Sequence, residues 1–111
     1  MTRQAATFEV LGGYLTEAGA VDVEWMTDAI TLDCMNSEPL YRAALDSRRR
    51  ARSVAVEFLM DFVNNGLRFA GFRGLRATNA QVMAFDRQHG GGLSRVLDAV
   101  EDYIKVYRED R

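Results

Sequence analysis

The last predicted helix, residues 93–109, constrains the fold of this chain more than any other segment. Its apolar side chains recur three and four residues apart, so on a helical wheel they fall within about 120° and leave the opposite side charged. This stripe consists of Leu93, Val96, Leu97, Val100, Tyr103, Ile104 and Tyr107. Such a helix must bury one face against other elements, and this predicts a layered helical protein.

Four further segments have helical spacing or helix-boundary residues, and no segment alternates as a strand does. They are residues 5–18, a segment that begins at Asp22, residues 37–65 and residues 78–89. Asp22, Ser37 and Thr78 are the expected N-caps, and Gln81 follows Thr78 at capping-box spacing. We expect the third of these segments to end at Asn65-Gly66, with a break near Asp46 left open. Residues 66–77 are then either a loop or a helix weakened by glycine.

These patterns predict an all-α fold: a compact bundle of four or five helices that forms a single domain over residues 1–111. The chain is 48% hydrophobic and 27% charged, which is typical of a globular domain with one core.

The residue types give little support to catalysis or metal binding. Cys34 is the only cysteine and His89 the only histidine, so a zinc site built from several such ligands is excluded. Cys34 lies on the apolar stripe of its predicted helix, which is typical of a buried structural thiol. The sequence contains no glycine-rich phosphate-binding motif. We therefore expect no enzymatic activity, no metal and no cofactor.

Cysteine usage and the start of the chain bear on location. One cysteine cannot form a disulfide within the chain, and this is typical of a reducing compartment. Residues 1–15 hold no apolar stretch of signal-peptide or membrane-spanning length. We expect a cytoplasmic protein that does not associate with a membrane.

Charge is distributed unevenly along the chain. Residues 1–40 hold seven acidic residues and one arginine, whereas residues 41–95 hold ten arginines and four acidic residues. Two hypotheses follow. The acidic and basic parts pair with each other inside the fold, or one charged face meets a charged partner.

Four arginines occupy the five positions 48–52, namely Arg48, Arg49, Arg50 and Arg52. If this stretch is helical, the four side chains fan around about 200° of the helix, so they cannot all meet one phosphate backbone. Asp46 then lies four residues before Arg50, at the spacing of a helical ion pair. The cluster is therefore interpreted as solvated or internally paired, as protein-facing, or as nucleic-acid-facing.

A second basic stretch alternates with aromatic residues. Arg68, Arg73 and Arg76 interleave with Phe69 and Phe72, a combination that can hold single-stranded nucleic acid. The alternative is that both phenylalanines anchor a connection to the core while the arginines face water. From the two stretches together, the residues predicted to bind RNA or DNA are Arg49, Arg52, Arg73 and Arg76.

The helix that begins at Asp22 has two apolar sides. Trp25 and Leu32, seven residues apart, point away from its core stripe, and Glu24 and Asp28 lie near them. An apolar anchor surrounded by charge is typical of a binding hot spot. These four residues are therefore the predicted contacts with a protein partner that has a basic surface.

The function predicted from the sequence is non-enzymatic binding of a macromolecular partner, with a protein as the first candidate. Adaptors, assembly factors and inhibitors belong to this class, including viral and mobile-element modulators of host machinery. The alternative is direct binding of RNA or DNA through the arginine-rich middle. A homo-oligomer is a third possibility, in which residues 93–109 would pair with their copy if their stripe is not covered within the chain.

Overall fold

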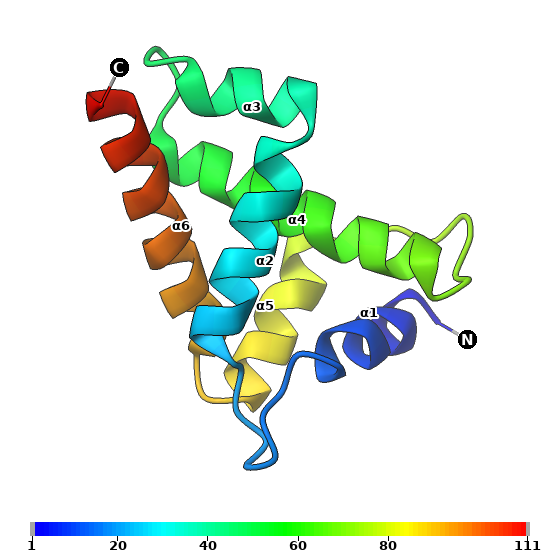
Figure 1. Cartoon of the computed structure of the whole chain (residues 1–111). Coiled ribbons are helices and arrows are strands. Elements are labelled where there is room, and N and C mark those ends of the chain that lie inside the picture. Colours follow the sequence, from blue (N-terminus) through cyan, green and yellow to red (C-terminus); the bar gives the residue numbers. More distant parts are fainter. Residues whose placement is uncertain (1, 111) are drawn as a thin grey trace.

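The computed structural model describes residues 2–110 and contains six helices, joined by turns and loops (Figure 1). They are α1 (Arg3–Gly12), α2 (Val23–Met35), α3 (Glu38–Leu45), α4 (Ala51–Phe69), α5 (Asn79–Gln88) and α6 (Gly92–Glu109). Helices α2, α4 and α6 pack against one another, α1 packs against α4 and α5, and α3 covers one end. The all-α prediction is confirmed, with six helices in place of four or five.

Helix α6 buries the stripe that its periodicity predicts. Leu93, Val96, Val100 and Ile104 have no solvent exposure, and Leu97 has almost none. Tyr103, at the edge of the stripe, is partly exposed. Most of the apolar face of α6 is therefore covered by the chain itself.

Local capping explains where two helices begin. Asp22 Oδ1 accepts a hydrogen bond from the backbone N–H of Trp25 at 3.1 Å. Thr78 and Gln81 form the predicted reciprocal capping box, in which each side chain accepts from the other residue's backbone N–H. The predicted starts of α2 and α5 are confirmed.

The expected helix over residues 37–65 is two helices. Helix α3 ends at Leu45 and α4 begins at Ala51, so Arg48, Arg49 and Arg50 lie in the connection. The helical-wheel placement of the arginine cluster is therefore wrong, and the Asp46–Arg50 pair does not form. Asp46 Oδ1 instead accepts from Arg48 Nε at 3.0 Å, and hydrogen bonds from Arg48 lower the pKa of Asp46.

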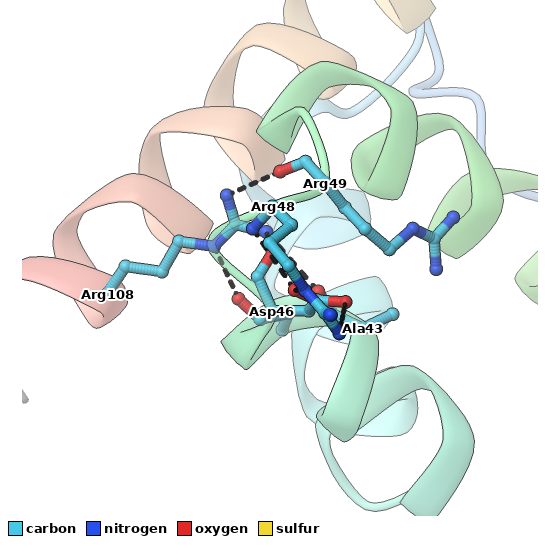
Figure 2. Close-up of polar contacts among 6 residues, drawn as sticks. Ala43, Asp46, Arg48, Arg49 and Arg108 are labelled. Carbon is cyan, nitrogen blue, oxygen red and sulfur yellow. Dashed lines mark hydrogen bonds and ion pairs between the residues drawn. The ribbon is translucent and has the colours of Figure 1, made fainter.

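Arg108, near the end of α6, holds this connection in place (Figure 2). Its guanidinium donates to the backbone oxygens of Ala44 at 2.6 Å, Arg49 at 2.8 Å, Asp46 at 2.8 Å and Ala43 at 3.3 Å. Two of these oxygens, those of Ala43 and Ala44, belong to the last turn of α3, where helix carbonyls run out of donors in the helix itself. The Ala43 oxygen also accepts from the backbone N–H of Asp46 at 3.2 Å. One side chain thus satisfies the end of α3 and fixes the start of α4.

Glycine positions also differ from expectation. Helix α1 ends at Gly12, whereas the predicted helix continued to Ala18. The predicted stop at Gly66 is wrong, because α4 continues to Phe69. A Cβ at Gly66 would lie 2.8 Å from Val10 Cγ1, so this glycine allows α1 to approach α4 closely. Gly66 also lines the groove described next.

Candidate interaction surface

Helix α2 has a buried side and an exposed apolar side. Met26, Ile30 and Cys34 are fully buried. Trp25 is 53% exposed and Leu32 is 69% exposed, so the structure points both outward, as their spacing predicts. Large apolar side chains at this exposure are candidates for contact with another molecule.

Leu32 borders a groove of about 390 Å³ between α2 and the C-terminal half of α4, here called the α2–α4 groove. Its lining consists of Tyr14, Ala29, Leu32, Asp33, Asn36, Phe62, Asn65, Gly66 and Phe69. Most of this lining is apolar, and Asp33 is its one formally charged side chain. The groove therefore offers an apolar surface with a carboxylate on the α2 wall.

An aromatic cluster connects Trp25 to this groove. The ring of Tyr14 stacks on Trp25 with 5.5 Å between centroids and lies 5.3 Å from the ring of Phe62. Burial and the nearby charge of Asp33 raise the pKa of the Tyr14 hydroxyl. Trp25, Tyr14 and Phe62 thus bring α2, the α1–α2 connection and α4 into one surface.

Phe69 is the most exposed large apolar side chain among the described residues, at 93%. The interpretation that Phe69 and Phe72 both anchor the connection after α4 is therefore wrong for Phe69. Phe72 is partly buried against the core, as that interpretation expects. Phe69 lines the α2–α4 groove and also a neighbouring hollow with Arg68, Arg73 and Gly74.

The two predicted acidic contacts, Glu24 and Asp28, are exposed on α2 but do not line the groove. At 3.6 residues per turn, Asp28 and Glu24 lie about 60° and 100° to one side of Trp25. Asp33 lies about 80° to the other side, where the groove is. The helical positions of α2 therefore place Asp33 as the carboxylate on the groove side, and the sequence interpretation missed this residue.

The fold does not neutralise the acidic face of α2. Within residues 2–110, neither Glu24, Asp28 nor Asp33 forms an ion pair. The one ion pair in this range that joins the acidic first forty residues to the basic middle is the local Glu38–Arg42 pair. The hypothesis that the two parts pair broadly inside the fold is therefore wrong for α2.

The four arginines predicted to bind nucleic acid have different surroundings. Arg49 pairs with Glu57 at 2.6 Å. Arg52 pairs with Asp98 at 2.6 Å and with Glu101 at 3.3 Å, both on α6. These two arginines are thus engaged within the fold.

Arg73 and Arg76 lie in the connection after α4 and are exposed. Neither has an ion pair or a hydrogen bond from its side chain to any part of the chain that the structure describes. Arg76 lines one hollow with Arg49, where Glu57 and Asp61 supply opposing charge. The four arginines therefore do not form one continuous basic surface.

The side chains that could act as a nucleophile, a general base or a metal ligand lie apart from this surface. Cys34 is buried and donates to the Phe58 carbonyl oxygen at 3.5 Å, and burial raises the pKa of its thiol to about 12. His89 lies at the end of α5, where its Nδ1 is 3.2 Å from the Gly19 carbonyl oxygen. In residues 2–110 no three side chains among His, Cys, Asp and Glu are grouped to hold a metal ion. The helices of the same range do not include one that is both long and apolar enough to span a membrane.

Comparison of the chain with protein-family models, with curated proteins and with solved structures finds no match. The functional argument therefore depends on the geometry of the α2–α4 groove and on the charges around it.

Proposed function

We propose that this protein acts by binding another protein through the α2–α4 groove and the exposed face of α2. The observation that carries the proposal is the placement of Leu32 and Phe69, two strongly exposed apolar side chains, on the border of one apolar groove. Apolar and aromatic anchors that become buried at the centre of an interface supply most of the binding energy in protein complexes.

The carboxylates of α2 form no ion pair with any of residues 2–110, and this supports a partner with a basic surface. Complementary charge around an apolar centre speeds association and selects the partner. The role that we propose is non-enzymatic, as an adaptor, an assembly factor or an inhibitor, and viral and mobile-element modulators of host machinery belong to the same class. A cytoplasmic location is part of the proposal, since Cys34 has no disulfide partner.

The test compares two variants that each place a carboxylate on an exposed aliphatic position. Leu32→Asp alters the groove, and Val106→Asp alters α6, where Val106 is 54% exposed and outside the groove lining. A tagged protein is used to capture partners from a nuclease-treated lysate, and captured proteins are quantified by mass spectrometry. We expect a partner whose recovery falls about tenfold or more with Leu32→Asp and is unchanged with Val106→Asp.

Circular dichroism and thermal unfolding establish that both variants remain folded. A partner that both variants recover as well as the wild type does would contradict the proposed surface.

A second candidate is direct binding of single-stranded RNA or DNA at the C-terminal end of α4. The observation that favours it is the exposed Phe69 beside Arg68 and Arg73 in one hollow, with Arg73 and Arg76 unpaired within the described residues. An exposed ring can stack on a base while arginines contact phosphates.

Fluorescence anisotropy with mixed-sequence oligonucleotides distinguishes this candidate from protein binding. Nucleic-acid binding should be measurable at about 50 mM salt, weaken strongly by about 200 mM and fall further in an Arg73→Ala, Arg76→Ala double variant. No binding at the lower salt concentration would remove this candidate.

The homo-oligomer considered from the sequence requires an uncovered stripe on residues 93–109. Five residues of that stripe are buried within the chain, so pairing through them would require the helix to leave its own core. Light scattering over a wide concentration range measures whether the protein self-associates by another surface.

A further inference from the structure

We infer that the segment which occupies the α2–α4 groove is an amphipathic helix of the partner protein, with lysine or arginine beside its apolar face. This inference rests on the proposed function and adds the conformation and the charge of the bound segment.

The backbone around the groove favours a helix as the bound segment. Both long walls of the groove are helices, whose main-chain groups are already hydrogen-bonded within α2 and α4. The described residues contain no strand, and their one isolated β-bridge joins Leu15 to Val21. An extended peptide in the groove would therefore find no edge to pair with and would bury unsatisfied N–H and C=O groups. A helix satisfies these groups internally.

The apolar lining favours a segment with anchors on one face. Leu32 on one wall, Phe62 and Phe69 on the other and Tyr14 between them present rings and methyl groups to the groove. A helix presents apolar side chains at i, i+3, i+4 and i+7 along one stripe, which is how helices bind in grooves of this type. The bound segment is therefore amphipathic.

The charges favour a basic flank on that segment. Asp33 lines the groove, Asp28 lies on the other side of Leu32, and neither has an ion-pair partner in residues 2–110. Asp33 also acts on Tyr14 of the lining, because burial first and the charge of Asp33 second raise the pKa of the Tyr14 hydroxyl. Arg68 and Arg73 lie beyond Phe69 in the neighbouring hollow. A cationic side chain of the partner can therefore approach the α2 wall without meeting another cation of the lining.

Trp25 provides a direct readout, because it is the only tryptophan in the chain and stacks on Tyr14 beside the groove. The probes are three synthetic amphipathic peptides of about 16 residues, roughly four helical turns. They share one leucine stripe and carry lysine, glutamine or glutamate on its flanks. Each is titrated into the full-length protein while Trp25 emission is recorded.

We expect the lysine peptide to shift Trp25 emission to shorter wavelength and to bind about two- to fivefold more tightly than the glutamine peptide at low salt. The glutamate peptide should bind more weakly than both. The difference should shrink at about 500 mM salt, because exposed charge pairs are screened.

Matched charge reversals complete the test. With Asp33→Lys, the glutamate peptide should bind more tightly than the lysine peptide. Asp102→Lys, on the exposed side of α6, should leave the order of the affinities unchanged. Equal affinity for the three peptides would overturn the basic flank and leave the apolar groove as a docking site.

A groove that binds none of the peptides, while Leu32→Asp still loses a cellular partner, would overturn the helical segment but not the proposed function. If the peptides do not bind and Leu32→Asp also loses no partner, both are overturned.

Discussion

The two ends of helix α4 carry similar numbers of arginines and differ in how these are used. At the N-terminal end, Arg49 and Arg52 pair with carboxylates, and Arg108 of α6 bonds to the backbone of the preceding connection. At the C-terminal end, Arg73 and Arg76 are exposed and unpaired within residues 2–110, and Phe69 stands in solvent beside the α2–α4 groove.

This difference teaches that density of charge along the sequence does not show which charges the fold leaves unpaired. The densest arginine cluster is largely engaged in holding the α3–α4 connection and attaching α4 to α6. Helix α2, where the sequence is acidic, has no ion pair within the described residues. Charges that the fold leaves unpaired, next to apolar side chains that it leaves exposed, are the better indication of a partner.

The largest expected effect on stability tests whether the contacts at the N-terminal end of α4 stabilise the fold. Arg108→Ala removes four hydrogen bonds to backbone oxygens, so we expect the free energy of unfolding to fall by about 2–3 kcal/mol. Urea denaturation monitored by circular dichroism measures this change. Arg108→Lys should recover only part of it, because an ammonium group cannot reproduce the planar fork of donors.

The matched control is Arg95→Ala, which removes an exposed arginine from the same helix. Its effect should stay within about 0.5 kcal/mol. If Arg95→Ala and Arg108→Ala lower the free energy of unfolding equally, arginines bonded within the fold would not differ from exposed ones in their effect on stability.

An intermediate effect on stability is expected at Cys34 of α2, whose thiol donates to the Phe58 carbonyl oxygen in the middle of α4. Its thiol pKa is raised from 9.0 to about 12 in the folded protein. Between these values the unfolded chain loses the thiol proton while the folded chain keeps it, so stability falls as pH rises. We expect a loss of about 1 kcal/mol between pH 8 and pH 10 from this group.

Chemical denaturation of the wild type and of Cys34→Ala at both pH values isolates this contribution. The variant should be less stable at pH 8, because it leaves a cavity, and should lose less stability at pH 10. The raised pKa of Tyr14 acts in the same direction in both proteins and cancels in the comparison. Parallel losses in the two proteins would contradict the raised thiol pKa.

The smallest expected effects on stability come from replacing one arginine at each end of α4. Arg52→Ala removes the pairs with Asp98 and Glu101, and since the Arg52 side chain is 44% exposed we expect a cost of about 0.5–1 kcal/mol. Arg73→Ala should change stability by less than about 0.3 kcal/mol, since the Arg73 side chain has no hydrogen bond or ion pair within the described residues. Thermal unfolding at low and high salt measures both, and the Arg52 effect should diminish with salt.

An Arg73→Ala variant that is destabilised as much as Arg52→Ala would show that the C-terminal end is not free. The proposal of an available surface there would then need revision.

Features that depend on neighbours in sequence could be predicted. The N-caps Asp22 and Thr78 act on residues three positions away, and the outward placement of Trp25 and Leu32 follows from helical spacing alone. The break after Leu45 could not be fixed from the sequence, because the apolar residues on either side keep one helical period across it. The side chain that stabilises the break, Arg108, lies about sixty residues later.

The groove could be predicted only on one side. The spacing within its own helix predicts that Leu32 is exposed. Tyr14, Phe62 and Phe69 come from other elements, and only packing brings them together with Leu32. Gly66 is the clearest case, because a glycine after asparagine indicates a helix end. Here Gly66 lies inside α4, where its missing side chain admits Val10 of α1. Tertiary contact overrode the local preference.

The contacts of Arg108 also have a consequence for how the chain is made. Residues 43–49 leave the ribosome well before the residue that fastens them, since 59 to 65 positions separate the partners. We therefore expect the end of α3 and the start of α4 to lack the bonds from Arg108 until the last turn of α6 emerges, with local backbone bonds alone to Ala43 and Asp46. This corner of the molecule should be the last to acquire protection in a pulse-labelling experiment on the nascent chain.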